Sequence, residues 1–246
     1  MINIKRNEVP TSLQYPEIRD YIDRTIQHKN DPDNFPKPKP PVSYRDSDVL
    51  GAFDRDFFSK CYLTEEKFPN SWSMDIEHFI PQNESPELVY EWSNLFPVAH
   101  YANMIKPRKT PEGGYLNPCD AADDVEHDII YCLLFNDEKP TFMARDRNNV
   151  KAVNTCLLLD KVHNGHNFET KQATELLRNA IRKKYFLILN TMLSYHHSPE
   201  DSQEKFQALG ELRDYLSKEQ SFTMLCRSIP AVLQFKNKEK LEDLFD

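Results

Sequence analysis

The stretch SMDIEHFIPQ, residues 73–82, decides how the central part of the chain folds. Apolar residues alternate with polar ones in its middle, which is the pattern of a half-buried β-strand. Asp75, Glu77 and His78 weaken that strand, because polar groups packed into it cost stability unless they are paired or bind something. The stretch therefore predicts a strand that carries chemistry.

The residues on either side of this strand predict short helices and a second strand. A helix is expected over 46–60, where apolar residues recur at helical spacing behind an Asp or Ser cap. After the strand we expect a short helix over 85–92, which opens with Ser and Pro. An apolar strand over 93–99 and one or two helical turns over 100–106, stopped by a proline, complete this block.

The rest of the chain is predicted to be mainly helical. Residues 1–45 form an N-terminal arm and a proline-rich connector, residues 46–118 form the central block, and residues 119–246 form a helical region for packing and partner docking. The segment DVEHDIIYCLLF (124–135) fits either a helix or a buried strand. The predicted fold class is mainly α (α+β).

Composition excludes several classes of protein. None of the apolar runs in the 246 residues approaches the roughly 18–20 residues of a membrane span, and the N-terminal residues MINIKRNEVP do not resemble a signal peptide. We therefore expect a cytoplasmic protein with no membrane partner. Five scattered cysteines without a CxxC pair argue against a disulfide framework and against a self-contained zinc finger.

The net charge also limits the function. Acidic residues outnumber basic ones by 39 to 31, so the net charge is −8 and the chain as a whole lacks the basic footprint of a nucleic-acid-binding protein. Any contact with nucleic acid must be local, or a partner must supply the affinity.

Four polar side chains within 27 residues could nevertheless support hydrolysis of a nucleic acid. Such a site needs a base, a group that orients the base, and ligands for a divalent cation. Glu77 and His78 stand at the end of the first strand, Asn94 at the start of the second, and Asn103 on the following helix. Histidine can accept a proton at neutral pH, and oxygen ligands suit Mg²⁺ or Mn²⁺.

Over roughly residues 46–180 the sequence resembles the HNH nucleases of Septu-type and retron-associated anti-phage defence systems. The segments that carry the resemblance are KCYLTE, DIEHFIPQ, EWSNLFPVAHYANMIKPRK and LNPCDAADDVEHDIIY. In the family the order is E-H-F-x-P, W-x-N-L and C-N-x-x-K, followed by a helical region that begins near L-N-P; this chain has the same order with Ala102 in place of the cysteine. The resemblance implies a small ββα-metal HNH motif at about 60–109, embedded in a helical domain, with residues 46–118 as the nuclease core.

The resemblance also implies a role for each residue. His78 would be the general base, Asn94 would orient it, and Glu77 and Asn103 would bind one divalent cation, Mg²⁺ or Mn²⁺. Two further residues could be metal ligands or lie beside the site, and three basic residues could contact substrate phosphate. The former are Asp75 and His100, and the latter are Lys106, Arg108 and Lys109.

The sequence departs from the family at the structural zinc site. Many relatives bind zinc through two CxxC pairs, whereas the corresponding positions here are Cys61, Thr64, Ala99 and Ala102. We therefore expect no structural zinc, because three of the four thiolates are missing. The hairpin must be held by packing, for which the candidates are Trp72, Phe79, Trp92, Phe96 and Tyr101.

Two functions are carried forward from the sequence. The first is a metal-dependent HNH endonuclease that acts in an anti-phage complex with an ATPase subunit and, where a retron belongs to the system, with its reverse transcriptase and nucleic acid. The second is a catalytically weak or inactive HNH-fold subunit that serves for interaction. The intact Glu77, His78, Asn94 and Asn103 favour the enzyme, and the missing zinc ligands and the acidic charge favour the interaction subunit.

Overall fold

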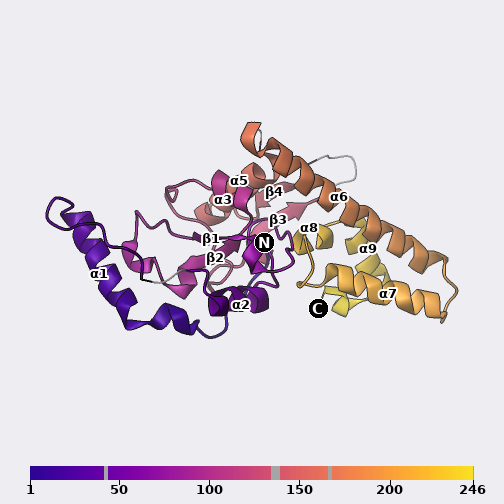
Figure 1. Cartoon of the computed structure of the whole chain (residues 1–246). Coiled ribbons are helices and arrows are strands. Elements are labelled where there is room, and N and C mark those ends of the chain that lie inside the picture. Colours follow the sequence, from indigo (N-terminus) through magenta and orange to yellow (C-terminus); the bar gives the residue numbers. More distant parts are fainter. Residues whose placement is uncertain (42–43, 134–138, 166–167, 246) are drawn as a thin grey trace.

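A computed structural model describes residues 1–41, 44–133, 139–165 and 168–245. Over these ranges the protein is mainly helical and has two small antiparallel sheets of two strands each, which confirms the predicted fold class in outline (Figure 1). The sheets lie in the middle of the molecule, with α1 at one end and the long α6 beside α7 at the other (Figure 1). The strands are β1 (Asp75–His78), β2 (Leu95–Val98), β3 (Ile129–Cys132) and β4 (Thr141–Ala144). The helices are α1 (Pro16–Asn30), α2 (Ser47–Asp56), α3 (His100–Ile105), α4 (Val125–Asp128), α5 (Val150–Asn164), α6 (Phe168–His197), α7 (Gln203–Leu216), α8 (Thr223–Arg227) and α9 (Pro230–Glu239).

Local sequence explains where several helices begin. The side chain of Asn149 accepts a hydrogen bond from the main-chain N–H of Ala152 at the start of α5, and Ser202 does the same for Lys205 at the start of α7. Such caps satisfy N–H groups that have no partner inside the helix. Helix α1 begins with Pro16, whose fixed φ suits the first helical position.

The predicted order of elements in the central block is confirmed with one correction. Helix α2, strands β1 and β2, and helix α3 lie where the sequence placed them. The helix expected over 85–92 is wrong: the chain forms two short 3₁₀ turns, Pro86–Leu88 and Trp92–Asn94. The carbonyl of Leu88 accepts a hydrogen bond from the side chain of Asn94, and not the main-chain hydrogen bond that a continuing α-helix would supply. The segment 124–135, whose pattern fits either a helix or a strand, forms one of each in its described part: α4 is followed directly by β3.

Strands β1 and β2 form the frame on which the candidate residues stand. They pair antiparallel, with Asp75 opposite Val98 and His78 opposite Leu95. Helix α3 begins two residues after β2 ends, which brings it back beside β1.

The hairpin is held by a buried aromatic cluster. Phe96 of β2 packs at 4.8–5.8 Å between ring centroids against Phe57, Tyr62 and Phe79. Trp92 is also buried and stacks on a neighbouring phenylalanine. The expectation for Trp72 is wrong, because this side chain is 61% exposed.

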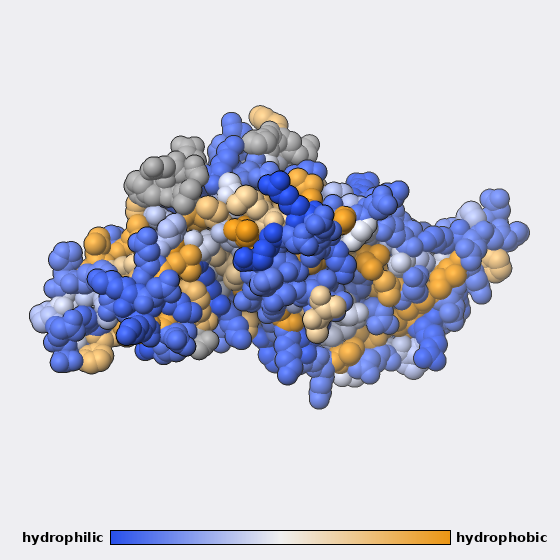
Figure 2. Space-filling view, turned by 180° about the vertical axis from the view of Figure 1, so that it is seen from behind, coloured by the Kyte–Doolittle hydropathy of each residue, from blue (hydrophilic) through white to orange (hydrophobic). Residues whose placement is uncertain are grey.

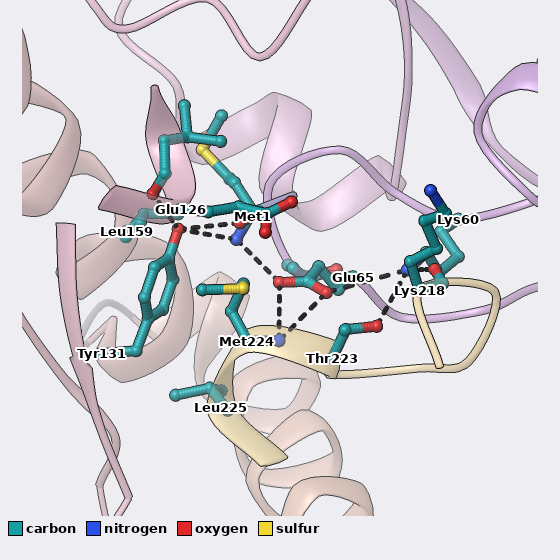
Figure 3. A network of polar contacts seen from close by, with 12 residues as sticks. Met1, Lys60, Glu65, Glu126, Tyr131, Leu159, Lys218, Thr223, Met224 and Leu225 are labelled. Atoms are coloured by element: carbon teal, nitrogen blue, oxygen red, sulfur yellow. Dashed lines mark hydrogen bonds and ion pairs between the residues drawn. The ribbon is translucent and has the colours of Figure 1, made fainter. Parts of the chain in front are cut away.

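A buried polar network joins the N-terminal residue and helix α8 to the centre of the chain (Figure 3). The amino group of Met1 lies 2.7 Å from Glu65 Oε1 and donates to the hydroxyl of Tyr131 in β3. Lys60 is 2% exposed and donates to Thr223 of α8 and to two neighbouring carbonyls. Burial would raise the pKa of Glu65, but the charges of Met1 and Lys60 outweigh it and hold that pKa at about 2. The network therefore fastens α8 to the central sheets through charge.

The surface is mostly polar. Figure 2, which shows the side opposite to Figure 1, has hydrophilic residues over most of this face and hydrophobic patches along the arm that carries α1. In the helical region, Leu176, Leu193 and Phe206 are among the exposed large apolar residues. Use of this region for partner docking stays a prediction. In the described part of the chain, each helix is too short or too polar to cross a membrane.

Candidate active site

The candidate residues are presented by β1 and the first turns of α3. Successive side chains of a strand point to opposite faces, so Asp75 and Glu77 share one face of β1 and His78 lies on the other. Glu77 pairs with Phe96 and is buried, whereas Asp75 at the start of the strand is half-buried. The two acids therefore have different surroundings although they lie on the same face.

His78 is held in one orientation by three neighbours. Its Nε2 lies 2.8 Å from the carbonyl oxygen of Val89, and because a carbonyl only accepts, Nε2 carries the hydrogen. Nδ1 is then the atom with the lone pair, and it accepts from Gln82 Nε2 at 3.0 Å. The ring of Tyr44 lies edge-on to the imidazole, with 5.1 Å between centroids.

The charge state of His78 suits a base. Burial lowers the pKa of His78, and the nearby charge of Lys106 acts in the same direction, while the hydrogen bond to Val89 opposes them. The net direction is downward, so the imidazole is neutral at pH 7 and can accept a proton at Nδ1.

The side-chain contacts of Asn94 differ from the expected ones. We expected it to bond His78 directly, but its side chain bonds main-chain atoms of the preceding loop. Its Nδ2 donates to the carbonyls of Ile80 at 3.0 Å and Leu88 at 3.1 Å, and its Oδ1 accepts from the N–H of Ile80 at 2.7 Å. Asn94 thus closes the loop that follows β1 and places the neighbouring Val89 carbonyl, which orients His78 in its stead.

Glu77 and Lys106 form a buried ion pair. Lys106 Nζ lies 2.8 Å from Glu77 Oε1, and the hydroxyl of Tyr62 donates to the same oxygen. Both charged side chains are about 5% exposed or less. Burial raises the pKa of Glu77, and the charge of Lys106 opposes that rise.

Lys106 therefore differs from the expected phosphate-binding residue. Besides Glu77 it donates to the carbonyls of His78 at 3.2 Å and Phe79 at 3.1 Å. An ammonium group has three N–H donors, and these three contacts use them all. Lys106 ties the end of β1 to α3, and although it lines the same pocket as His78, its ammonium group is already fully bonded.

Asn103 meets Asp75 and His100 at a second, more exposed position. Asp75 Oδ2 lies 2.8 Å from His100 Nδ1 and 3.1 Å from Asn103 Nδ2. The side chain of Asp75 is 34% exposed and that of His100 is 75% exposed. These three residues, two of which were only optional candidates in the sequence, lie together.

An open pocket of about 600 Å³ lies at the first position and reaches Asn103 of the second. Glu77 and His78 from β1 line it together with Asn103 from α3 and Arg108 from the following loop. Arg108 and Lys109 are both exposed, so the basic cluster that could meet phosphate is reduced to these two. The structure thus brings His78, Asn103 and Arg108 around one pocket.

Sequence reasoning missed three residues that support His78. Gln82 follows His78 by four residues in the stretch SMDIEHFIPQ, and its polar side chain so close to a candidate base could have indicated a contact. Tyr44 and Val89 are remote in sequence from His78, and Val89 acts through its main chain, which no residue type reveals.

The position of the missing thiolate site is filled by the core. Cys61 is buried and its sulfur accepts from the N–H of Thr64, while Ala99 and Ala102 are fully buried. Among the described residues, His, Cys, Asp and Glu side chains form no group of three that could hold a metal ion. Comparisons of the chain with protein-family models, with curated proteins and with solved structures find no match.

Proposed function

We propose that the protein is an HNH-type endonuclease that hydrolyses phosphodiester bonds, with His78 as its general base. The observation that carries this proposal is the orientation of His78, whose Nε2–H is bound to Val89 and whose Nδ1 is left as the proton acceptor. This base lines a pocket together with Asn103 and Arg108. The order of β1, β2 and α3 agrees with the ββα unit that the resemblance implies.

The chain's own residues suggest how the reaction would proceed. A water molecule replaces the amide of Gln82 at Nδ1 of His78 and gives up its proton there while its oxygen bonds to phosphorus. The bond from phosphorus to the leaving oxygen breaks, and that oxygen takes a proton from solvent. Arg108 is an exposed cation at the pocket, Lys109 follows it in the chain and is also exposed, and both would bind the phosphate backbone.

A divalent cation, Mg²⁺ or Mn²⁺, would polarise the phosphate and stabilise its developing charge when bound. The amide oxygen of Asn103 fits such a cation, because the side chain lines the pocket and is not buried. Glu77 does not fit it, since its carboxylate is buried and already holds Lys106 and Tyr62. Of the two metal ligands that the family resemblance implies, the contacts in the structure therefore support Asn103 and not Glu77.

We further propose that the protein acts in the cytoplasm within an anti-phage complex. The net charge of −8 repels nucleic acid at long range, so an ATPase subunit, or a retron reverse transcriptase with its nucleic acid, would present the substrate. The exposed apolar residues of α6 and α7 are available for such contacts.

The test is cleavage of labelled DNA and RNA by the purified chain in Mg²⁺ or Mn²⁺, with and without co-purified partners. His78→Ala should lower the cleavage rate by at least about 100-fold, the usual share of a general base. His127→Ala is the matched control, because this exposed histidine bonds Asp128, does not line the pocket and should leave the rate unchanged. Equal cleavage by the His78→Ala variant would overturn the assignment.

The second candidate function is that of an HNH-fold interaction subunit without activity. The observation in its favour is the buried pair of Glu77 and Lys106, which neutralises one of the expected metal ligands from within the protein. A folded wild-type chain that cleaves neither DNA nor RNA under any of these conditions, yet still binds its partners, would decide for this candidate.

A further inference from the structure

We propose that the divalent cation of this protein is held by Asp75, Asn103 and His100, and that Glu77 is a positioning residue rather than a ligand. The role of this cation in catalysis rests on the proposed function, but its binding can be measured without any nuclease activity. The resemblance in sequence places the cation at Glu77 instead, so the two assignments make different predictions.

The three side chains already converge on one oxygen atom. Asp75 Oδ2 accepts from His100 Nδ1 at 2.8 Å and from Asn103 Nδ2 at 3.1 Å. Asp75 is fixed by its place in β1 opposite Val98, and the other two stand one turn apart at the start of α3. The strand and the helix therefore preorganise this cluster before any ligand arrives.

Each member of the cluster can turn from hydrogen bonding to metal binding. Rotation of the Asn103 amide about its last bond brings Oδ1 to the place of Nδ2. In the tautomer of His100 that carries its hydrogen on Nε2, Nδ1 is a ligand. A carboxylate, an amide oxygen and an imidazole form a set that suits Mn²⁺ and accepts Mg²⁺, and the exposure of Asp75 and His100 leaves room for water ligands.

Charge favours Asp75 over Glu77. The negative charge of Glu77 is already compensated by the buried ammonium of Lys106 at 2.8 Å. A cation at Glu77 would strip Lys106 of its carboxylate partner and leave an ammonium group buried beside two carbonyls, which is costly. In the described part of the chain the side-chain partners of Asp75 are His100 and Asn103, so its carboxylate is not engaged by a lysine or an arginine.

The cluster also lies where a cation could serve the site. Asn103 belongs both to the cluster and to the wall of the pocket that His78 lines. Glu77 then acts through Lys106, which holds the carbonyls of His78 and Phe79, and in this way it fixes the end of β1.

The experiment is titration of the full chain with Mn²⁺, followed by electron paramagnetic resonance of the free ion and by calorimetry, in the absence of nucleic acid. Asp75→Asn should weaken Mn²⁺ binding by at least about tenfold, and His100→Ala should weaken it less. Asn103→Asp should keep or strengthen binding, since it replaces an amide oxygen with a carboxylate. The double variant Glu77→Gln with Lys106→Met removes the buried pair as a whole, and it should bind Mn²⁺ within about twofold of the wild type.

Two results would overturn this assignment. The first is loss of Mn²⁺ binding by the double variant Glu77→Gln with Lys106→Met, together with retained binding by Asp75→Asn. The second is that the wild-type chain binds no Mn²⁺ at millimolar concentration. Circular dichroism of each variant shows whether it is folded. A chain that binds Mn²⁺ through Asp75 but cleaves no nucleic acid would support the site and refute the nuclease proposal, so the two failures can be told apart.

Discussion

Glu65 and Glu77 are two buried glutamates that each lie beside a lysine, yet their surroundings act in opposite directions. Glu65 faces two cations, the amino group of Met1 at 2.7 Å and Lys60 at 3.7 Å, and its pKa falls to about 2. Glu77 faces one cation and the hydroxyl of Tyr62, and burial raises its pKa.

This difference shows that the number of neighbouring cations decides how firmly a buried carboxylate is ionised and what it contributes to stability. Where two positive charges surround the carboxylate, it is firmly ionised and serves to join chain segments, as in the network of Figure 3. Where one charge opposes burial, the pKa of the carboxylate is still raised, so its ionised form contributes less to stability and a neutral replacement disturbs it less. The following predictions test this contrast, from the largest expected effect to the smallest.

Glu65→Gln should lower the free energy of unfolding by about 3–5 kcal/mol, because it leaves the charges of Met1 and Lys60 buried without their partner. Urea denaturation followed by circular dichroism measures the loss. The neighbouring Glu66→Gln is the control and should cost less than about 1 kcal/mol, since Glu66 is only partly buried and meets Tyr101 at 3.4 Å. Equal losses for the two variants would contradict the role of the network.

Acid should remove the same contribution. The pKa of Glu65 is about 2 in the folded chain against an ordinary value of 4.5, so its stabilisation is fully present above pH 4.5 and is lost as the pH falls toward 2. The loss is on the order of 3 kcal/mol. Denaturation midpoints of the wild type and of Glu65→Gln, measured between pH 6 and pH 2.5, should approach each other in acid. A difference between the two denaturation midpoints that stays constant over this pH range would refute the lowered pKa of Glu65.

Glu77→Gln should cost less, about 1–2 kcal/mol, because Lys106 keeps its bonds to two carbonyls and can still donate to the amide oxygen of glutamine. Adding Lys106→Met to this variant should restore part of the stability, since the unpaired ammonium is then removed as well. A double-mutant cycle of unfolding free energies checks both statements. A cost at Glu77 as large as that at Glu65 would erase the contrast between the two acids.

Thr223→Val should have the smallest effect, about 1 kcal/mol, because it removes a hydroxyl that accepts from Lys60 at 3.2 Å and donates to the Gln220 carbonyl at 2.9 Å, while the two carbonyl partners of Lys60 remain. Thr191→Val is matched to it, since Thr191 is also buried but its hydroxyl bonds only a carbonyl of its own helix. Thermal unfolding should separate the two variants by a few degrees, and an identical melting temperature would count against Lys60 as a clamp on α8.

The sequence predicted those features of the fold that depend on local pattern. Alternation of apolar and polar residues located β1, helical spacing located α2 and the helices beyond residue 119, and prolines marked where α3 must end. It also selected His78 and Asn103, because the type and order of these residues are visible along the chain. These features share one physical cause, which is that they arise from neighbours within a few residues.

The tertiary structure decided the partners of the polar groups. Asn94 bonds the main chain of Ile80 and Leu88, and Lys106 bonds Glu77, although the family resemblance implies a direct part for both residues in the chemistry of the site. Trp72 is predicted in the core and lies at the surface. A residue type states which bonds a side chain can make, but the backbone path decides which of them it makes.

What the sequence by itself determined is therefore the order of α2, β1, β2 and α3, the long helices of the second half, and the inventory of reactive groups near residue 78. Only the folded chain decided which acid is neutralised by a lysine and which stays open, since Glu77 and Asp75 are two residues apart on one strand face. Glu65 shows the same limit, because its partner Met1 is 64 residues away. Contacts across such distances depend on how helices and sheets pack together, and that packing leaves no local pattern in the sequence.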